Sequence, residues 1–224
     1  MLTVSDRPDY LVDTTHLLVT GVTGSRTEYG GKTAMSNWLA SNAGRAEFDV
    51  VLFLNVKHDD APERQADVVA QSVQEAAHAM GDGATHICIS PTDPDWTAVS
   101  RRLREFVDAL PTDLRKMVVL DEAPELDEDA LLWFVRVAGN GSNTKAVVIS
   151  QSPGALSTSV RQQCIWVWVG PGLEDVRHVF RANNRGHHLD YILENHDPYQ
   201  WTVITGPGEE DRDTFPPVPE EYAG

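Results

Sequence analysis

The sequence predicts an α/β fold in which a mostly parallel central sheet is flanked by helices on both faces. Short apolar runs alternate with longer helix-forming segments over the 224 residues, which is the order of elements that a parallel sheet requires. A glycine-rich turn with Gly31-Lys32-Thr33 follows the first apolar run, and the acidic pair Asp121-Glu122 follows a later one. These two segments predict that strands of the sheet end at a phosphate-binding site.

Each element follows from the apolar pattern and its boundaries. Strands are expected where short apolar runs are bounded by Gly, Pro, Asn or Asp, at residues 17–20, 50–55, 86–90, 117–120, 146–150, 164–169 and 201–205. Helices are expected between them, at residues 33–40, 62–80, 96–110, 127–138, 173–183 and 189–195. The cluster Thr92-Asp93-Pro94-Asp95 supplies capping side chains for the helix at residues 96–110.

The length predicts one domain with one core. From residue 206 the composition changes to Gly, Pro, Glu and Asp, so we expect a single domain over residues 1–206 and an acidic, disordered tail over residues 207–224. No apolar run is long enough to span a bilayer, and residues 1–9 do not resemble a signal peptide. This predicts a protein without an integral membrane segment that is intracellular or is carried by something assembled inside a cell. Cys88 and Cys164 lie in apolar strand patterns and are expected to be buried free thiols.

The turn Gly30-Gly31-Lys32-Thr33 matches the end of a Walker A loop. In such a loop, backbone N–H groups at a helix N-terminus surround phosphate oxygens, the lysine reaches the terminal phosphates and the hydroxyl binds Mg²⁺. Thr33 is therefore a candidate metal ligand. The candidate nucleotide-binding residues are Gly24, Ser25, Gly30, Gly31, Lys32, Thr33 and Ala34.

The start of this loop is irregular, because Arg26 stands where the usual pattern has its first glycine. Gly21-Val22-Thr23-Gly24-Ser25 reads as the opening of the motif, with five residues, 26–30, inserted before Gly31. The alternative is a phosphate cradle built from residues 26–33 without an insertion. A glycine-rich turn that binds no ligand is the third interpretation.

The run at residues 117–120 is interpreted as a Walker B strand. It would deliver Asp121 to the metal ion and Glu122 to an attacking water. Together the two motifs indicate a P-loop NTPase with ATP and Mg²⁺ as its expected cofactors.

The charge balance is strongly acidic. The chain has 34 Asp and Glu against 18 Lys and Arg, a net charge of −16, and only four of its basic residues are lysines. An acidic, lysine-poor surface keeps a protein hydrated in molar salt, where charge repulsion is screened. A halophilic source is one interpretation, and an ordinary acidic cytoplasmic protein with an acidic tail is the other.

Four segments in order resemble the FtsK/HerA superfamily of ring-forming, DNA-pumping ATPases. They resemble most closely the genome-packaging ATPases of internal-membrane icosahedral viruses. The matching segments are Gly21-Val22-Thr23-Gly24-Ser25 with Gly31-Lys32-Thr33, Asn55-Val56-Lys57, Asp121-Glu122-Ala123 and Ser150-Gln151-Ser152-Pro153. The similarity extends over residues 17–206 and implies a RecA-like P-loop NTPase core.

The resemblance also implies roles for individual residues. Gln151 would act as a polar sensor of the γ-phosphate, although a glutamine at a strand end can also simply face solvent. Lys57 matches the family signature, but a lone lysine after a strand is most often a solvated cap. His58-Asp59-Asp60 imitates a metal-binding cluster, yet consecutive residues cannot converge on one ion, and an acidic loop is the simpler interpretation.

Motors of this family need an arginine from the neighbouring subunit. Arg136 resembles this residue in position, and Arg161 is the second candidate. Arg177, Arg181 and Arg185 recur near helical spacing, which fits a DNA-facing surface or, more simply, a solvated helix face.

The resemblance implies an ATPase that assembles as a homo-oligomeric ring and moves double-stranded DNA, loading a viral genome into a preformed shell. Capsid or portal-vertex proteins would be further partners, and the host cytoplasm or the virion would be its location. Two alternatives stay open: a P-loop NTPase that is not a motor, and a nucleotide-binding scaffold without turnover.

Overall fold

A nine-stranded sheet forms the centre of the protein, as described by a computed structural model for residues 9–11, 13–21, 31–170, 173–197, 200–218 and 222. The strand order is β3-β4-β2-β5-β6-β1-β7-β8-β9, and the seven strands from β3 to β7 in this order are parallel. The last two strands are antiparallel additions at one edge. The strands are β1 (Leu17–Gly21), β2 (Val50–Leu54), β3 (Val68–Ala70), β4 (His86–Ile89), β5 (Lys116–Leu120), β6 (Thr144–Ile149), β7 (Ile165–Val169), β8 (Trp201–Ile204) and β9 (Arg212–Phe215).

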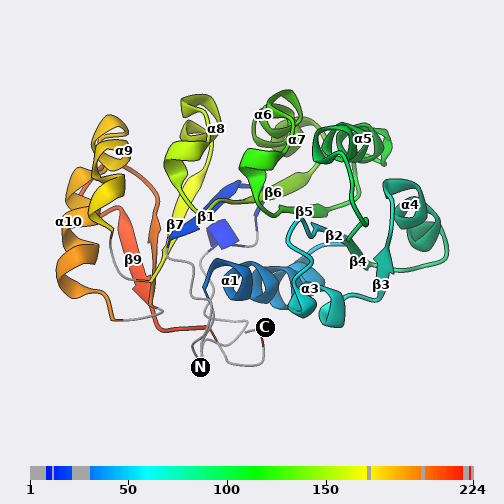
Figure 1. Cartoon of the computed structure of the whole chain (residues 1–224), viewed down its shortest axis with the longest axis horizontal. Coiled ribbons are helices and arrows are strands. Elements are labelled where there is room, and N and C mark those ends of the chain that lie inside the picture. The colour runs from blue at the N-terminus through cyan, green and yellow to red at the C-terminus, as the bar shows by residue number, and fades with distance from the viewer. Residues whose placement is uncertain are drawn as a thin grey trace.

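Helices cover both faces of this sheet, as the sequence predicts (Figure 1). The helices are α1 (Lys32–Trp38), α2 (Arg45–Glu47), α3 (Asp60–Gln65), α4 (Val73–Gly81), α5 (Trp96–Ala109), α6 (Glu128–Arg136), α7 (Ala138–Gly141), α8 (Thr158–Gln162), α9 (Arg177–Ala182) and α10 (Gly186–Asn195). In Figure 1, α1 and α3 lie below the sheet, and α4, α5, α6, α8 and α9 lie above it. The central strands β1, β2 and β5 are buried along their whole length, which is why their sequences are mostly apolar and show no alternation with polar residues.

Two predicted elements are wrong. The helix expected at residues 62–80 is divided into α3, the short strand β3 and α4. Val68 and Val69 are β-branched and pair with β4 at the sheet edge, while Ser72 caps α4 by accepting a hydrogen bond from the Glu75 N–H at 3.1 Å. The pattern Ser72-Val73-Gln74-Glu75 is a helix-start signal that could have revealed this break.

The expectation of a disordered tail after residue 206 is wrong for residues 212–215. This segment forms β9, which pairs with β8, and the ring of Phe215 stacks on Trp201 at a centroid distance of 4.2 Å. Val218 is buried as well. Aromatic cross-strand contact supplies the apolar burial that the polar composition of the tail does not suggest.

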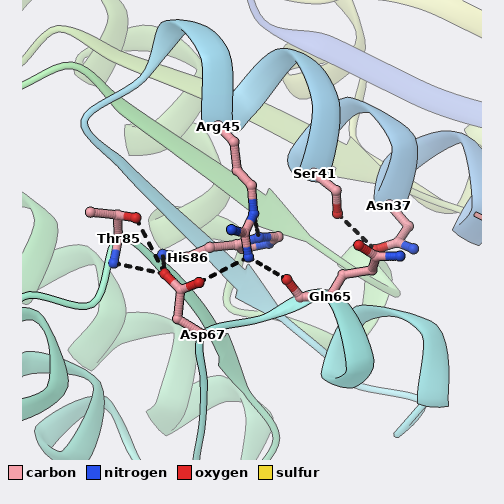
Figure 2. A network of polar contacts seen from close by, with 7 residues as sticks. All are labelled: Asn37, Ser41, Arg45, Gln65, Asp67, Thr85 and His86. Carbon is pink, nitrogen blue, oxygen red and sulfur yellow. Dashed lines mark hydrogen bonds and ion pairs between the residues drawn. The ribbon is translucent and has the colours of Figure 1, made fainter.

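A polar network holds the start of β3 and β4 against α2 (Figure 2). Arg45 donates to Asp67 at 3.0 Å, to the backbone carbonyl of Gln65 and to Nδ1 of His86 at 2.9 Å. The other oxygen of Asp67 accepts hydrogen bonds from Thr85 and from the backbone N–H of His86. A π-helix, Leu39–Gly44, joins α1 to α2, so this network connects the first helix to the far edge of the sheet.

All four lysines of the chain are engaged in specific contacts rather than spread over the surface. Lys116 donates to the backbone carbonyls of Pro111 and Leu114, and Lys145 donates to those of Tyr10, Asp13 and Thr15. Lys32 and Lys57 lie in the site described below. The exposed basic residues are therefore arginines. Both cysteines are buried free thiols, as the sequence predicts.

The described residues contain no helix that is both long and apolar enough to cross a membrane.

The fold buries three histidines, and we therefore predict that the protein is less stable at pH 5 than at pH 7. Burial lowers the pKa of His16, His86 and His188 to about 4. The unfolded chain binds protons at these rings near pH 6.5, whereas the folded chain binds them only near pH 4, so acid favours unfolding across this window. Asp121, whose pKa burial raises to about 6, opposes the effect as one group against three.

This expectation is checked by urea unfolding at pH 7 and pH 5 in molar salt, which screens the net charge. The unfolding midpoint should fall at pH 5. The variant His16→Asn keeps an acceptor for the Ala146 N–H and removes one titrating ring, so its midpoint should depend less on pH. Equal midpoints for the wild-type protein at the two pH values would contradict the prediction.

Candidate functional site

The motif residues lie at one edge of the sheet because the strands that precede them are parallel. The strands β1, β2, β5 and β6 all end there. Strand β6 lies between β1 and β5, so Gln151 emerges between the end of β1 and the pair Asp121-Glu122. This order of strands, rather than closeness in sequence, brings the motifs together.

Lys32 begins α1 and is 3% exposed. Its Nζ donates to the backbone carbonyl of Gly21 at 3.1 Å, which joins the end of β1 to the start of α1. Burial, and then the positive charge of Lys57, lower the pKa of Lys32 to about 8, while Glu122 and Asp121 oppose this shift. A partly desolvated ammonium group of this kind is suited to binding phosphate.

Gly21 itself has a structural reason to be glycine. Its φ of +132° is rarely accessible to other residues, and a Cβ there would lie 2.1 Å from the carbonyl oxygen of Val169. The predicted phosphate-binding residues Gly24, Ser25 and Gly30, and the predicted insertion at residues 26–30, lie outside the described residues.

Gly31, Thr33 and Ala34 form the first turn of α1 together with Lys32. The carbonyl of Gly31 accepts a hydrogen bond from the Met35 N–H at 3.1 Å, and Ala34 is buried against the sheet. The hydroxyl of Thr33 donates to Oδ2 of Asp59 at 3.1 Å. The predicted metal ligand on α1 is therefore in contact with an acidic side chain from the loop after β2.

Asp121 is a buried carboxylate with an unsatisfied oxygen. It is 1% exposed, and its Oδ1 is buried without a hydrogen-bond partner among the described residues. Its Oδ2 accepts a 3.4 Å hydrogen bond from the backbone N–H of Lys57. Since an unpartnered buried carboxylate oxygen is costly, Asp121 fits a position beside a bound cation such as Mg²⁺.

Glu122 adopts a left-handed backbone conformation, with φ 40° and ψ 51°. Such a conformation is uncommon for a residue with a long side chain, and strain of this kind concentrates at functional sites. Its Oε1 forms an ion pair with Nζ of Lys57 and accepts a 2.9 Å hydrogen bond from Nε2 of Gln151. The structure therefore brings Gln151 and Glu122 into contact.

Lys57 and Asp59 are the residues that sequence reasoning undervalued. Lys57 touches both Asp121 and Glu122, and Asp59 touches Thr33. Within the described part of the chain, no group of three or more His, Cys, Asp or Glu side chains is arranged to hold a metal ion. The only sequence signal for Lys57 was its match to a family signature.

The structure separates the two arginine candidates. Arg136 is exposed on α6. Arg161 is only 9% exposed, and its guanidinium donates to the carbonyls of Pro153 and Leu156 and to the hydroxyl of Thr158. The Arg161 guanidinium is thus bound within its own loop, whereas the Arg136 side chain is exposed, so of the two the structure favours Arg136 as the arginine that could reach a neighbouring subunit.

The three arginines near helical spacing have different surroundings. Arg177 pairs with Glu174 and Asp190 on the surface, and Arg185 lies over the ring of Trp166 at 4.7 Å. Arg181 is exposed.

The strand order, the buried lysine at the start of α1 and the acidic pair after β5 define a RecA-like α/β fold. Solved structures with this fold include the genome-packaging NTPase B204 of Sulfolobus turreted icosahedral virus 2 in complex with ATP-γS. Its TM-score is 0.65 at 8% sequence identity, covering 92% of this chain and 99% of that chain. B204 in complex with sulfate has a TM-score of 0.68 at 8% identity, covering 92% and 98% of the two chains.

The crystal structure of B204 described as the DNA-packaging ATPase of Sulfolobus turreted icosahedral virus is also similar. Its TM-score is 0.66 at 8% identity, with 92% of this chain and 99% of that chain covered. No protein-family model and no curated protein sequence matches the chain. At this level of identity the likeness concerns the fold.

A pair of variants tests the assignment of the two arginines. We expect Arg161→Ala to lower the free energy of unfolding by about 1–3 kcal/mol, because it leaves buried carbonyls unsatisfied. Arg136→Ala, an exposed matched control, should change it by less than about 0.5 kcal/mol. Chemical denaturation measures both values, and equal stability of the two variants would contradict the structural role of Arg161.

Proposed function

We propose that this protein is an ATPase that moves double-stranded DNA and loads a viral genome into a preformed capsid. The observation that carries the proposal is the convergence of Lys32, Thr33, Asp121, Glu122 and Gln151 at one edge of the sheet. The similarity in fold to B204, whose structures are described as those of a genome-packaging NTPase, supports the viral context. Membership of the FtsK/HerA superfamily is part of the same proposal.

The side chains suit hydrolysis of a nucleoside triphosphate. Lys32 binds the β- and γ-phosphates, while Thr33 and Asp121 hold Mg²⁺, which supplies positive charge to phosphate oxygens. Glu122 orients the attacking water and accepts its proton as the water oxygen bonds to the γ-phosphorus and the β–γ bridging oxygen leaves. Gln151 donates to the γ-phosphate or holds the same water.

The motor function needs more than one subunit. In our proposal the chain forms a homo-oligomeric ring, and the exposed Arg136 reaches the nucleotide of the adjacent subunit. Capsid or portal-vertex proteins would hold the ring at the packaging vertex of the virion, or the ring would form in the host cytoplasm.

The acidic surface points to a halophilic source. The four lysines are all engaged in specific contacts, and Lys116 and Lys145 are fully buried, which leaves arginine as the surface cation. In molar salt, affinity for DNA is weak, so a ring that encircles its substrate depends less on a basic surface than an open binding protein does.

The net charge of −16 also favours a second candidate, an NTPase that is not a DNA motor. A single measurement distinguishes the DNA motor from the NTPase that is not a motor. ATP hydrolysis is followed at high salt with and without linear double-stranded DNA, and we expect DNA to increase the rate severalfold. An unchanged rate supports the non-motor NTPase, and nucleotide binding without turnover supports a scaffold.

A second experiment tests the roles of Glu122 and Lys32. Glu122→Gln keeps the shape of the side chain but removes the proton acceptor, so kcat should fall by about 10²-fold or more while ATP affinity is kept. Lys32→Ala removes the cation that faces the phosphates, so nucleotide affinity should also fall.

Calorimetry and a phosphate-release assay separate the two effects, and circular dichroism controls for folding. Turnover of Glu122→Gln within a few-fold of wild type would remove Glu122 from the mechanism. Normal binding and turnover by Lys32→Ala would show that the phosphate site lies elsewhere.

A further inference from the structure

The loop between β2 and α3 contacts three of the proposed site residues. The backbone N–H of Lys57 reaches Asp121 at 3.4 Å, and the Lys57 ammonium pairs with Glu122. Two residues later, Asp59 accepts the hydroxyl of Thr33 at 3.1 Å. We propose that Lys57 is a positioning residue for hydrolysis, which holds the Glu122 carboxylate for the attacking water, and that Asn55 sets Lys57 in place. This inference rests on the proposed function.

Asn55 closes the loop with both ends of its amide. Its Oδ1 accepts the Asp59 N–H at 3.0 Å, and its Nδ2 donates to the Asp59 carbonyl at 3.0 Å. Asn55 is completely buried, and Nδ2 also lies 3.4 Å from Oε1 of Glu63. A buried amide with these partners fixes the path of the chain between residues 55 and 59.

His58 holds the same loop from the other side. It has a left-handed φ of 55°, and its Nδ1 lies 2.8 Å from the hydroxyl of Ser90, which donates to Glu63 at 2.6 Å. His58 is thereby bound to the residue that follows β4, and this residue in turn contacts α3. Lys57 lies between these anchors, and its direction is set by the turn rather than by its own flexible stem.

Lys57 and Gln151 both contact the same oxygen of Glu122, Oε1. Within the described residues, the second oxygen, Oε2, has no hydrogen-bond partner, so it is the oxygen available to accept a proton from water. The Lys57 and Glu122 side chains are 27% and 15% exposed, which makes their attraction stronger than that of a surface pair.

The geometry argues against a solvated cap, which was the simplest interpretation of Lys57 from sequence. A cap would place its ammonium in water, whereas this ammonium lies against the proposed water-orienting carboxylate. Lys57 contacts the Glu122 carboxylate, which in our proposal orients the attacking water and is not part of the apolar core. Loss of the Lys57 side chain should therefore affect turnover more than folding.

The test compares Lys57→Met with Lys57→Arg, and uses Asp60→Asn as a control from the same region with an exposed side chain. We expect Lys57→Met to lower kcat about 10- to 100-fold, with the dissociation constant for ATP within a few-fold of wild type. Lys57→Arg, which keeps the cation, should recover most of kcat, and Asp60→Asn should match wild type. If Lys57→Met does not fold, Asn55→Asp, which loses the donor to the Asp59 carbonyl, should show the same selective fall in kcat.

A double variant separates positioning from a structural role. If Lys57 acts through Glu122, Lys57→Met in the Glu122→Gln background should not slow turnover further. Additive losses, an unchanged kcat for Lys57→Met, or a loss of ATP affinity as large as the loss of kcat would each overturn the inference. A wild-type protein that does not hydrolyse ATP would instead refute the proposed function.

Discussion

The site depends on one constraint, which is that β1, β2, β5 and β6 are parallel and adjacent in the order β2-β5-β6-β1. Parallel strands end at a common edge, so residues more than 100 positions apart in the chain reach each other there. The strands are buried on both faces, and α1 together with the helices α4 to α10 is needed to cover them. Packing of the two helical layers therefore holds the geometry of the site.

The charged side chains at this edge of the sheet are positioned by ion pairs and hydrogen bonds with one another as well as by packing against the core. Lys32 and Asp121 are both buried. Removing a charged side chain from water costs free energy unless an opposite charge or a hydrogen bond compensates for it. Lys57, Glu122 and Gln151 form the more accessible part of the same cluster. At the opposite ends of the strands, the buried ammonium groups of Lys116 and Lys145 instead donate hydrogen bonds to backbone carbonyls.

Much of the fold could be predicted because the central strands are apolar on both faces and the capping residues are conspicuous. The helix at α5 and the strands β2, β4 and β5 follow the expected ranges closely. The strands at the two edges of the sheet were harder to predict from the sequence. Strand β3 is short and exposed, and β9 has a polar sequence, so both depend on pairing with a neighbouring strand that has no local signature.

The sequence by itself determined the fold class and pointed to the residue types of the candidate site, because glycine, lysine, threonine and paired carboxylates have few other uses in this pattern. Only the tertiary structure decided which side chains meet. It placed Arg161 in its own loop and left Arg136 exposed. It also brought Lys57 to Asp121 and Glu122 after β5, and Asp59 to Thr33 in the first turn of α1. The physical reason is that hydrogen bonds and ion pairs of this kind depend on strand order and loop path, which are set by packing over the whole sheet rather than by any local segment.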